Sequence, residues 1–290
     1  MHQRSALATL KDVGARTFKE ADDIKQYNPP QFGVGHHDGI QYHFFSGDKV
    51  FCLRTFVAPS LFHTSVWTYD GGVRELFNDN RELTIKESDH VDLESSDIAW
   101  KVDGRHGVIA LRGKNEPLTV DFDVKHTLYW EGPSTGPVYH QPDLQARIAY
   151  KGRTYDAIGY CKRYWYDPPV LYWGYRFIQG PTDDRSYVLW TADATFNAAK
   201  YAYFKFLLAD GALLAADIRD SLHRQDFALG TIDGVQYEVT LQELGAWGTI
   251  LKSDRMDTQL HLRFCRMHIH FDGKSLPGYC INETGFGTIR

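Results

Sequence analysis

The feature that most constrains this chain is the alternation of apolar and polar residues along several of its segments. The clearest example is the segment 118–130, LTVDFDVKHTLYW, where apolar residues occupy nearly every second position from Leu118 onward. Successive side chains of a strand point to opposite faces, so this pattern predicts a half-buried β-strand, and a helix would not produce it. Segments 144–150 and 235–244 alternate in the same way.

Short turn sequences separate these segments at regular intervals. They combine Gly with Asp or Lys, as in SGDK, YDGG, VDGR, YKGR, GPTDD, ADGA, IDGV and FDGK. Many short strands joined by such turns are typical of an antiparallel sandwich or barrel, so we expect an all-β chain. The short segment 1–30 is expected to be weakly helical and to end at the sequence NPP, because proline blocks a helix. Residues 196–211 fit a helix or a strand.

The order of the turns is faintly repeated along the chain. Strands around SGDK are followed by YDGG and VDGR, and strands around GPTDD are followed by ADGA and IDGV. A repeat of this kind predicts two similar β domains. The segment 132–143, GPSTGPVYHQPD, is rich in Pro and Gly, as a domain boundary is. We therefore expect an N-terminal segment 1–30, a β domain 31–140 and a second β domain 141–290.

Composition argues against several functional classes. The chain has 290 residues, 43% of them hydrophobic and 24% charged, and this balance supports a folded core. A net charge of −5 without a basic run argues against a nucleic-acid partner. No apolar run reaches the ~20 residues of a membrane span, and the N-terminus lacks the apolar region of a signal peptide. The four cysteines form no C-x-x-C pair, so we expect free thiols and a cytoplasmic protein.

The segment 158–177, IGYCKRYWYDPPVLYWGYRF, concentrates aromatic and basic residues. Alternation in its first half places Tyr160 and Lys162 on one face of a strand and Arg163 on the other. The rings could fill a core, with the cations at an exposed edge, or they could line a pocket for an apolar molecule. An unpaired buried cation is costly, and aromatic faces offset part of that cost, so the density of rings favours the pocket.

The same segment carries a resemblance to a known family. Gly159, Tyr160 and Trp165, followed by a proline-containing loop and then by Trp173 and Gly174, resemble a signature of the lipocalin-like hydratase and cyclase superfamily. That superfamily includes carotenoid hydratases, kievitone hydratase, fungal Diels–Alderases and AttH-like proteins. The C-terminal run GKSLPGYCINETGFGTI is similar to the family's closing strand. The resemblance implies two lipocalin-like antiparallel β domains and an enzyme that acts on an apolar small molecule such as a terpenoid or a polyketide.

One departure from the family pattern changes the chemistry that we expect. Hydratases of the family carry His, an acid, His and Asn where this chain has Cys161, Lys162, Arg163 and Tyr164, so the acid that would protonate an alkene is missing. This argues against a carotenoid hydratase and suits a cofactor-free lyase or isomerase, of cyclase or pericyclase type, with an oxygenated substrate. The expected catalytic residues are Tyr160, Lys162, Arg163, Asp167 and Glu283, and the expected substrate-binding residues are Tyr164, Trp165, Tyr172, Trp173 and Tyr175.

The expected catalytic residues divide by role. Lys162 or Arg163 would hold a carbonyl or enolate oxygen, and Tyr160 and Tyr164 would donate protons. Two carboxylates, those of Asp167 and Glu283, are candidates for a relocated acid or base. Aromatic walls would exclude water and hold the substrate in a reactive shape.

Two other functions are compatible with the sequence. A lipocalin-like barrel can carry an apolar ligand without converting it. His268 and His270 share one face of a predicted strand, and with Glu283 they could form the metal site of a hydrolase. The opposite face of that strand is wholly apolar, which favours an exposed row of histidines and no metal. Structural roles are expected for three isolated histidines: His43, His63 and His140.

Overall fold

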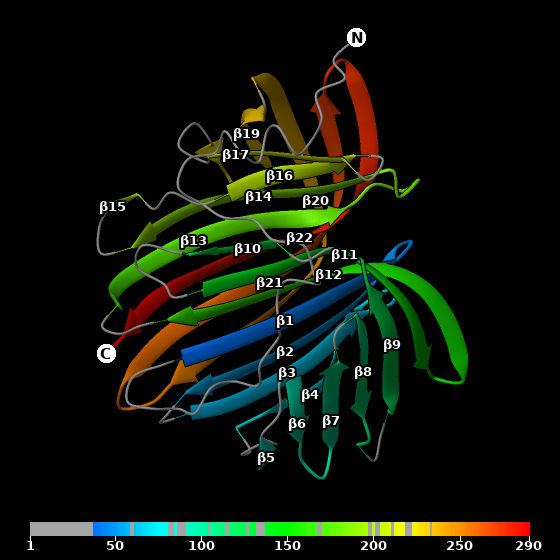
Figure 1. Cartoon of the computed structure of the whole chain (residues 1–290), viewed down its shortest axis with the longest axis vertical. Coiled ribbons are helices and arrows are strands. Elements are labelled where there is room, and N and C mark those ends of the chain that lie inside the picture. The colour runs from blue at the N-terminus through cyan, green and yellow to red at the C-terminus, as the bar shows by residue number, and fades with distance from the viewer. Residues whose placement is uncertain are drawn as a thin grey trace. The chain divides into compact units, whose positions relative to one another are not determined.

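A computed structural model describes residues 37–58, 61–80, 84–85, 91–103, 105–113, 116–125, 128–131, 137–166, 170–196, 199–200, 204–209, 212–217, 222–232 and 234–290. Most of these residues lie in strands, and this part of the chain contains no helix (Figure 1). It therefore holds no helix able to cross a membrane. The all-β class is confirmed, and the segment 1–30, expected to be helical, lies outside the described residues.

Within the described residues, the first of two antiparallel sheets follows the order β4-β3-β2-β1-β12-β11-β9-β8-β7-β6-β5, with β10 paired to β11. Most neighbours are also consecutive in the chain, but β1 pairs with β12 near the middle of the sheet. The strands of the first sheet are β1 (His37–Ser46), β2 (Lys49–Ala58), β3 (Leu61–Tyr69), β4 (Val73–Asp79), β5 (Thr84–Ile85), β6 (Val91–Glu94), β7 (Ile98–Asp103), β8 (His106–Leu111), β9 (Leu118–Val124), β10 (Leu128–Glu131), β11 (Pro137–Tyr150) and β12 (Arg153–Tyr166).

The second sheet follows the order β17-β16-β14-β13-β22-β21-β20-β19-β18, with β15 paired to β14. Here β13 pairs with β22, the last strand of the chain. The strands of the second sheet are β13 (Val170–Pro181), β14 (Tyr187–Phe196), β15 (Ala199–Lys200), β16 (Phe204–Ala209), β17 (Ala212–Asp217), β18 (Leu222–His223), β19 (Phe227–Ile232), β20 (Val235–Lys252), β21 (Met256–Phe271) and β22 (Lys274–Ile289).

The first sheet curls round its own hydrophobic core. The rings of Tyr42 on β1 and Trp100 on β7 lie 5.5 Å apart, although five steps in the strand order separate these strands. Five steps of ~4.8 Å would place them roughly 24 Å apart in a flat sheet, so the sheet must turn back on itself. Other large side chains of this core include Phe44, Phe51, Leu53, Val120, Phe122, Leu144, Ile148 and Tyr150.

The second sheet curls in the same way. The hydroxyl groups of Thr191 on β14 and Tyr237 on β20 are 2.5 Å apart, although four steps in the strand order separate these strands. A flat sheet would hold them roughly 19 Å apart. Each sheet thus forms a curled half-barrel with its own interior, which agrees with the expected lipocalin-like fold. The core of the second sheet includes Ile178, Leu189, Val239, Cys265, Met267, Ile269 and Cys280.

The described strands form two compact units, one from β1 to β12 and the other from β13 to β22. The division lies between Tyr166 and Val170, whereas the sequence placed it at residue 140. The difference arises because β11 and β12 pair with β9 and β1, so residues 137–166 complete the first sheet. The segment rich in Pro and Gly leads into β11 and does not separate the two units.

The predicted alternation is confirmed along β9, where each residue is buried or exposed in strict turn from Leu118 to Val124. The expected strand 118–130 is nevertheless divided in two. Its second part is β10, and the two parts pair with different stretches of β11 on either side of a bulge. The ambiguous segment 196–211 contains a strand, β16. All four cysteines are free and buried, as their spacing indicated.

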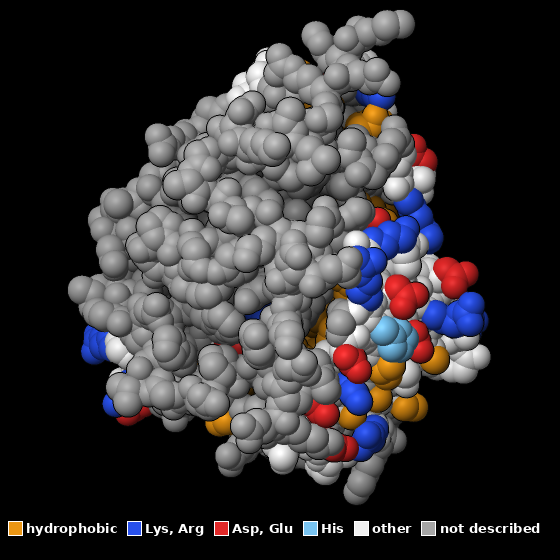
Figure 2. Space-filling model, viewed as in Figure 1, with side chains coloured by type: hydrophobic (Ala, Val, Ile, Leu, Met, Phe, Trp, Pro, Cys, Tyr) orange, Lys and Arg blue, Asp and Glu red, His pale blue; other side chains and the backbone are white. Residues whose placement is uncertain are grey.

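Charged side chains of both signs are interspersed on the described surface visible in Figure 2. The exposed pairs include Arg112 with Glu94 at 3.3 Å and Arg147 with Asp156 at 3.9 Å. On this face the described residues form no extended basic patch.

Candidate functional site

The first half of the aromatic and basic segment forms the end of β12, which lies between β1 and β11, and its second half leads into β13. The residues of the first half alternate as expected. Cys161 packs in the hydrophobic core of the first sheet, so Arg163 shares the core face, while Tyr160 and Lys162 lie on the opposite face. Both cations are 1% exposed, which rules out the exposed edge that was the alternative interpretation.

On the core face, Arg163 is held by Asp38. Its Nη2 donates to Oδ2 of Asp38 at 2.8 Å, and its Nε lies 3.2 Å from Oδ1. Both side chains are 1% exposed, so this is a buried ion pair. Arg163 therefore forms a buried ion pair on the core face, away from Tyr160 and Lys162. Burial raises the pKa of the neighbouring Cys161 thiol to about 12, so this thiol is protonated at neutral pH.

On the opposite face, Tyr160 forms a hydrogen bond with His43. Nδ1 of His43 lies 2.5 Å from the hydroxyl oxygen of Tyr160, and the two residues are directly opposed on β1 and β12. Their side chains are 1% and 2% exposed. The ring of His140 on β11 stacks on Tyr160 at 6.2 Å between centroids. A phenol that is hydrogen-bonded to an imidazole can donate a proton and take it back, so this pair is able to act as a general acid or base.

A row of polar side chains crosses the same face beside this pair. The row runs through β11, β12, β1, β2 and β3, and each member lies directly opposite the next in the strand register. A face that turns away from the core usually meets water, yet every residue of this row is buried. We call it the polar row: His140, Lys162, Gln41, Arg54 and Ser65.

Gly159, the first residue of the family-like motif, lets β1 and β12 approach each other here. A Cβ atom at this position would lie 2.6 Å from the backbone oxygen of His43 and 2.4 Å from the ring of Phe44. Only a residue without a side chain fits such a contact. The motif thus has a local physical reason, since Gly159 positions the strand that carries Tyr160.

The second unit holds a buried acid on its own non-core face. Glu283 on β22 accepts a hydrogen bond of 2.5 Å from the hydroxyl of Tyr175 on β13. Phe177 stacks on Tyr175 at 4.2 Å and lies 5.1 Å from the ring of Trp190. A Cβ atom on Gly285 would meet the Tyr175 ring at 2.7 Å, so the missing side chain leaves room for that ring. Two predicted site residues, Glu283 and Tyr175, are therefore brought together.

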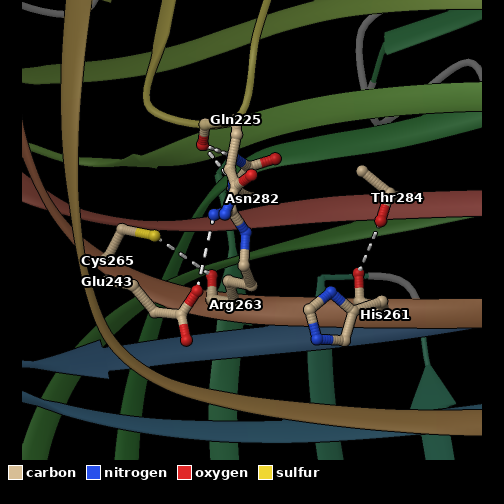
Figure 3. Close-up of polar contacts among 7 residues, drawn as sticks. All are labelled: Gln225, Glu243, His261, Arg263, Cys265, Asn282 and Thr284. Carbon is tan, nitrogen blue, oxygen red and sulfur yellow. Dashed lines mark hydrogen bonds and ion pairs between the residues drawn. The ribbon is translucent and has the colours of Figure 1, made fainter.

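Polar contacts also line the core face of the second sheet, as Figure 3 shows. Nη1 of Arg263 lies 3.4 Å from Oε2 of Glu243, and its Nη2 donates to the backbone oxygen of Gln225. Nδ2 of Asn282 donates to that same oxygen at 3.2 Å. The pKa of Arg176 on this face is lowered mainly by burial and then by the positive charge of nearby arginines. These contacts join β20, β21 and β22 to the turn between β18 and β19, and none of the predicted site residues takes part in them.

The alternative metal site does not form. His268 lies opposite Pro277, whereas Glu283 lies opposite Leu262, six residues earlier on β21. At ~3.3 Å per residue this separation is about 20 Å, far beyond any shared coordination sphere. His268 and His270 are exposed, and the described residues contain no cluster of three or more His, Cys, Asp or Glu that could hold a metal ion.

Five predicted site residues have side chains outside the described part of the structure. Asp167 lies outside the described residues. The structure gives only the backbone of the other four, in β12 and β13: Tyr164, Trp165, Tyr172 and Trp173.

His43 and Arg54 were not among the site residues expected from the sequence. His43 is separated from its partner Tyr160 by 117 residues, and the pairing of β1 with β12 is not visible in the sequence. Arg54 left a usable signal, because it interrupts FCLRTFV, a segment that apart from Thr55 is otherwise apolar on both faces. A single cation in such a strand indicates a buried charge.

No protein-family model and no curated protein sequence matches the chain. Solved structures do match over most of its length. An AttH-type protein of Nitrosomonas europaea aligns with a TM-score of 0.56 and 13% identity, over 92% of this chain and 98% of that one. Kievitone hydratase from Nectria haematococca aligns with a TM-score of 0.58 and 10% identity, over 88% of this chain and 89% of that one.

CghA, solved with Sch210972, aligns with a TM-score of 0.52 and 12% identity, over 88% of this chain and 89% of that one. The chain has the fold of these proteins. This agrees with the resemblance drawn from Gly159, Tyr160 and the Trp-Gly pair of β13. At such identities the likeness concerns the fold, and the chemistry has to be argued from the side chains of this chain.

Proposed function

We propose that the chain is an enzyme that transfers a proton to an apolar small molecule, in a lyase or isomerase reaction of the hydratase or cyclase type. The observation that carries the proposal is the buried hydrogen bond between His43 and Tyr160, next to the buried Lys162. These groups lie on the face of the first sheet opposite its hydrophobic core. The packing of that core therefore does not explain why they are there. The shared fold with kievitone hydratase supports the reaction class.

Each side chain has a defined task in the proposed reaction. Lys162 polarises a carbonyl oxygen conjugated with the reacting double bond, which makes the far carbon of that bond electrophilic. Tyr160 gives its proton to the other carbon while His43 stabilises the phenolate that forms. Water, or a hydroxyl of the substrate itself, bonds to the electrophilic carbon and returns its proton to Tyr160. The side chains end as they began, and the substrate gains water or a ring.

The proposal can be tested with kievitone, the compound in the name of a structural neighbour, and with a panel of polyenes and conjugated enones. Incubation in D₂O followed by mass spectrometry detects hydration as the gain of one D₂O. Ring closure leaves the mass unchanged apart from exchanged deuterons and is detected by its new retention time. We expect turnover of at least one compound, and a rate about 10²–10⁴ lower in the Tyr160→Phe variant.

Matched controls make the result decisive. His43→Gln is expected to slow turnover as Tyr160→Phe does, whereas His268→Gln, which changes an exposed histidine in the other unit, is expected to leave it unchanged. Circular dichroism checks that each variant is folded. A chain that binds these compounds saturably and returns all of them unchanged is a carrier. Full turnover by the Tyr160 and His43 variants would show that the site lies elsewhere.

A further inference from the structure

Three neighbouring side chains, two at one end of the polar row and one beside it, have buried polar atoms without a hydrogen-bond partner among the described residues. Arg54 on β2 and Ser65 on β3 are directly opposed, and His63 lies two residues before Ser65 on the same face. Within the described residues, Nε and Nη1 of Arg54, Oγ of Ser65 and Nδ1 of His63 are buried without a hydrogen-bond partner. Their residues are 6%, 1% and 3% exposed. We call these three side chains the Arg54 cluster.

Such a cluster needs a physical reason. Buried polar side-chain atoms nearly always have a hydrogen-bond partner, and burying a guanidinium without one is costly. The described partner of Arg54 is the ring of Phe56, whose centroid lies 5.6 Å from Cζ. A cation–π contact offsets part of the cost of the charge but leaves the N–H groups unused. Several unused polar atoms next to one another indicate a place where a ligand supplies the missing partner.

The charge of the cluster is that of Arg54. Burial, and next the positive charge of Arg54, lower the pKa of His63 to about 4, so its imidazole is neutral at pH 7. Nε2 of His63 lies 2.9 Å from Oδ1 of Asn78, an acceptor, so Nε2 carries the proton. Asn78 in turn donates to Glu75. The cluster therefore presents the N–H donors of a cation, a hydroxyl that can donate, and the acceptor Nδ1 of a neutral ring.

The register places this cluster next to the proposed catalytic groups. Arg54 lies opposite Gln41, and Gln41 lies opposite Lys162, all on one face. At ~4.8 Å per strand, Arg54 is about 10 Å from Lys162 along the polar row. A medium-sized molecule can span that distance, with one end at the cluster and its reacting part beside Tyr160.

We infer that Arg54 and Ser65 form a binding subsite for an oxyanion, a carboxylate or an enolate, at the polar end of an otherwise apolar substrate. The binding of an oxyanion at this subsite does not depend on the proposed function. The inference rests on the proposed function only in saying which reaction the bound molecule undergoes. Arg54 donates charged hydrogen bonds to the anionic oxygen, Ser65 donates a further one, and the neutral His63 adds no second charge. The substrate class is thus narrowed from apolar molecules to apolar acids and enolisable ketones.

The test uses cis-parinaric acid and its methyl ester, which share one polyene chain and fluoresce when they enter an apolar site. The carboxyl end is negatively charged in the acid and is a neutral methyl ester in the other compound. Titration of the full chain is expected to give tighter binding of the acid than of the ester. Arg54→Gln is expected to weaken the binding of the acid about tenfold or more, with the affinity for the ester changed less than about twofold. The control Arg147→Gln removes an exposed arginine of the same unit and is expected to change neither.

A second variant covers the case in which Arg54→Gln does not fold. Ser65→Ala removes a hydroxyl that has no hydrogen-bond partner among the described residues, so it is expected to fold and to weaken the binding of the acid selectively. The inference is overturned if the wild-type chain binds the acid no tighter than the ester, or binds neither, or if a folded variant keeps the full preference. Fluorescence titration measures binding and requires no turnover. The absence of a preference for the acid would therefore contradict this inference, whereas full turnover by Tyr160→Phe would contradict the proposed function.

Discussion

At the scale of single residues, neighbours in the sequence have different surroundings. Lys162 and Arg163 adjoin in the chain, yet one lies in the polar row and the other reaches Asp38 inside the core. The period of two predicted that they would face apart. The sequence could not say which face is the core, because that depends on strands far away in the chain. For this reason the sequence did not show that Arg163, expected to be catalytic, lies on the core face and pairs with Asp38.

The buried ion pair leads to a prediction about stability. Asp38→Asn leaves the charge of Arg163 uncompensated in the core, and we expect the free energy of unfolding to fall by about 3–5 kcal/mol. Urea denaturation followed by fluorescence measures this change. The matched control is Asp156→Asn, because Asp156 pairs with Arg147 at 3.9 Å in a largely exposed position. That variant is expected to lose less than about 1 kcal/mol. Equal losses in the two variants would mean that the pair at Asp38 is not a buried one.

At the scale of the elements, the internal repeat is visible in the order of the strands. The hairpin β1–β2 takes the same place in its sheet as β13–β14, and β12 takes the place of β22. The Asp-Gly sequences YDGG and ADGA both follow the third strand of this order, β3 and β16. The third pair differs, since VDGR joins β7 to β8 and IDGV joins β19 to β20. The repeat drawn from the sequence therefore paired two of the turns correctly. At the third it paired VDGR with a turn that lies one hairpin away from its true counterpart in the second sheet.

The repeat extends to the candidate groups. His43 and Tyr160 bridge β1 and β12, and Tyr175 and Glu283 bridge β13 and β22, the corresponding strands of the second sheet. Each pair is buried on the face opposite its own core. The sequence predicted three of these four residues but not their partnerships. Pairing joins segments more than a hundred residues apart, and no local pattern records it.

Strand β21 shows how much a local pattern can establish. Its burial alternates along the stretch that contains Met267, which is fully buried, and His268, which is exposed. We expect Met267→Ala to lower the free energy of unfolding by about 2–5 kcal/mol, because it leaves a cavity in the core of the second sheet. His268→Ala is expected to change it by less than about 0.5 kcal/mol. Thermal and urea denaturation check both values, and a large loss in His268→Ala would show that the faces are assigned the wrong way round.

At the scale of the whole molecule, the chain combines two curled sheets, each with its own hydrophobic interior. Apolar periodicity predicted these interiors well. Apart from the apolar segment around Arg54, it gave little sign that a second face of the first sheet is buried as well, because polar residues of that face such as Gln41 and Lys162 resemble a solvated surface in the sequence. The candidate site depends on that second buried face. Tyr160 and Lys162 were predicted because they lie in the aromatic and basic segment, whereas His43 and Arg54 lie more than a hundred residues away from it in the sequence.

Burial of the second face makes the stability of the molecule depend on pH through His63. Its pKa is about 4 in the folded chain, against an ordinary value of 6.5 for histidine, and burial is the main cause. Between these values the unfolded chain binds the proton more readily, so stability is full above about pH 6.5 and falls as pH drops toward 4. At 1.36 kcal/mol per pKa unit, His63 alone removes about 2–3 kcal/mol between roughly pH 7.5 and pH 4.5.

Comparison with a variant isolates this contribution from that of other titrating groups. His63→Gln has no charge to gain, so its free energy of unfolding should decline less over the same interval, by about 2–3 kcal/mol, than that of the wild-type chain. Urea denaturation at the two pH values gives this difference directly. The exposed His268→Gln variant should follow the wild-type chain at both values. If His63→Gln lost as much stability in acid as the wild type, His63 would have to be solvated, and the buried second face of the first sheet would be wrong.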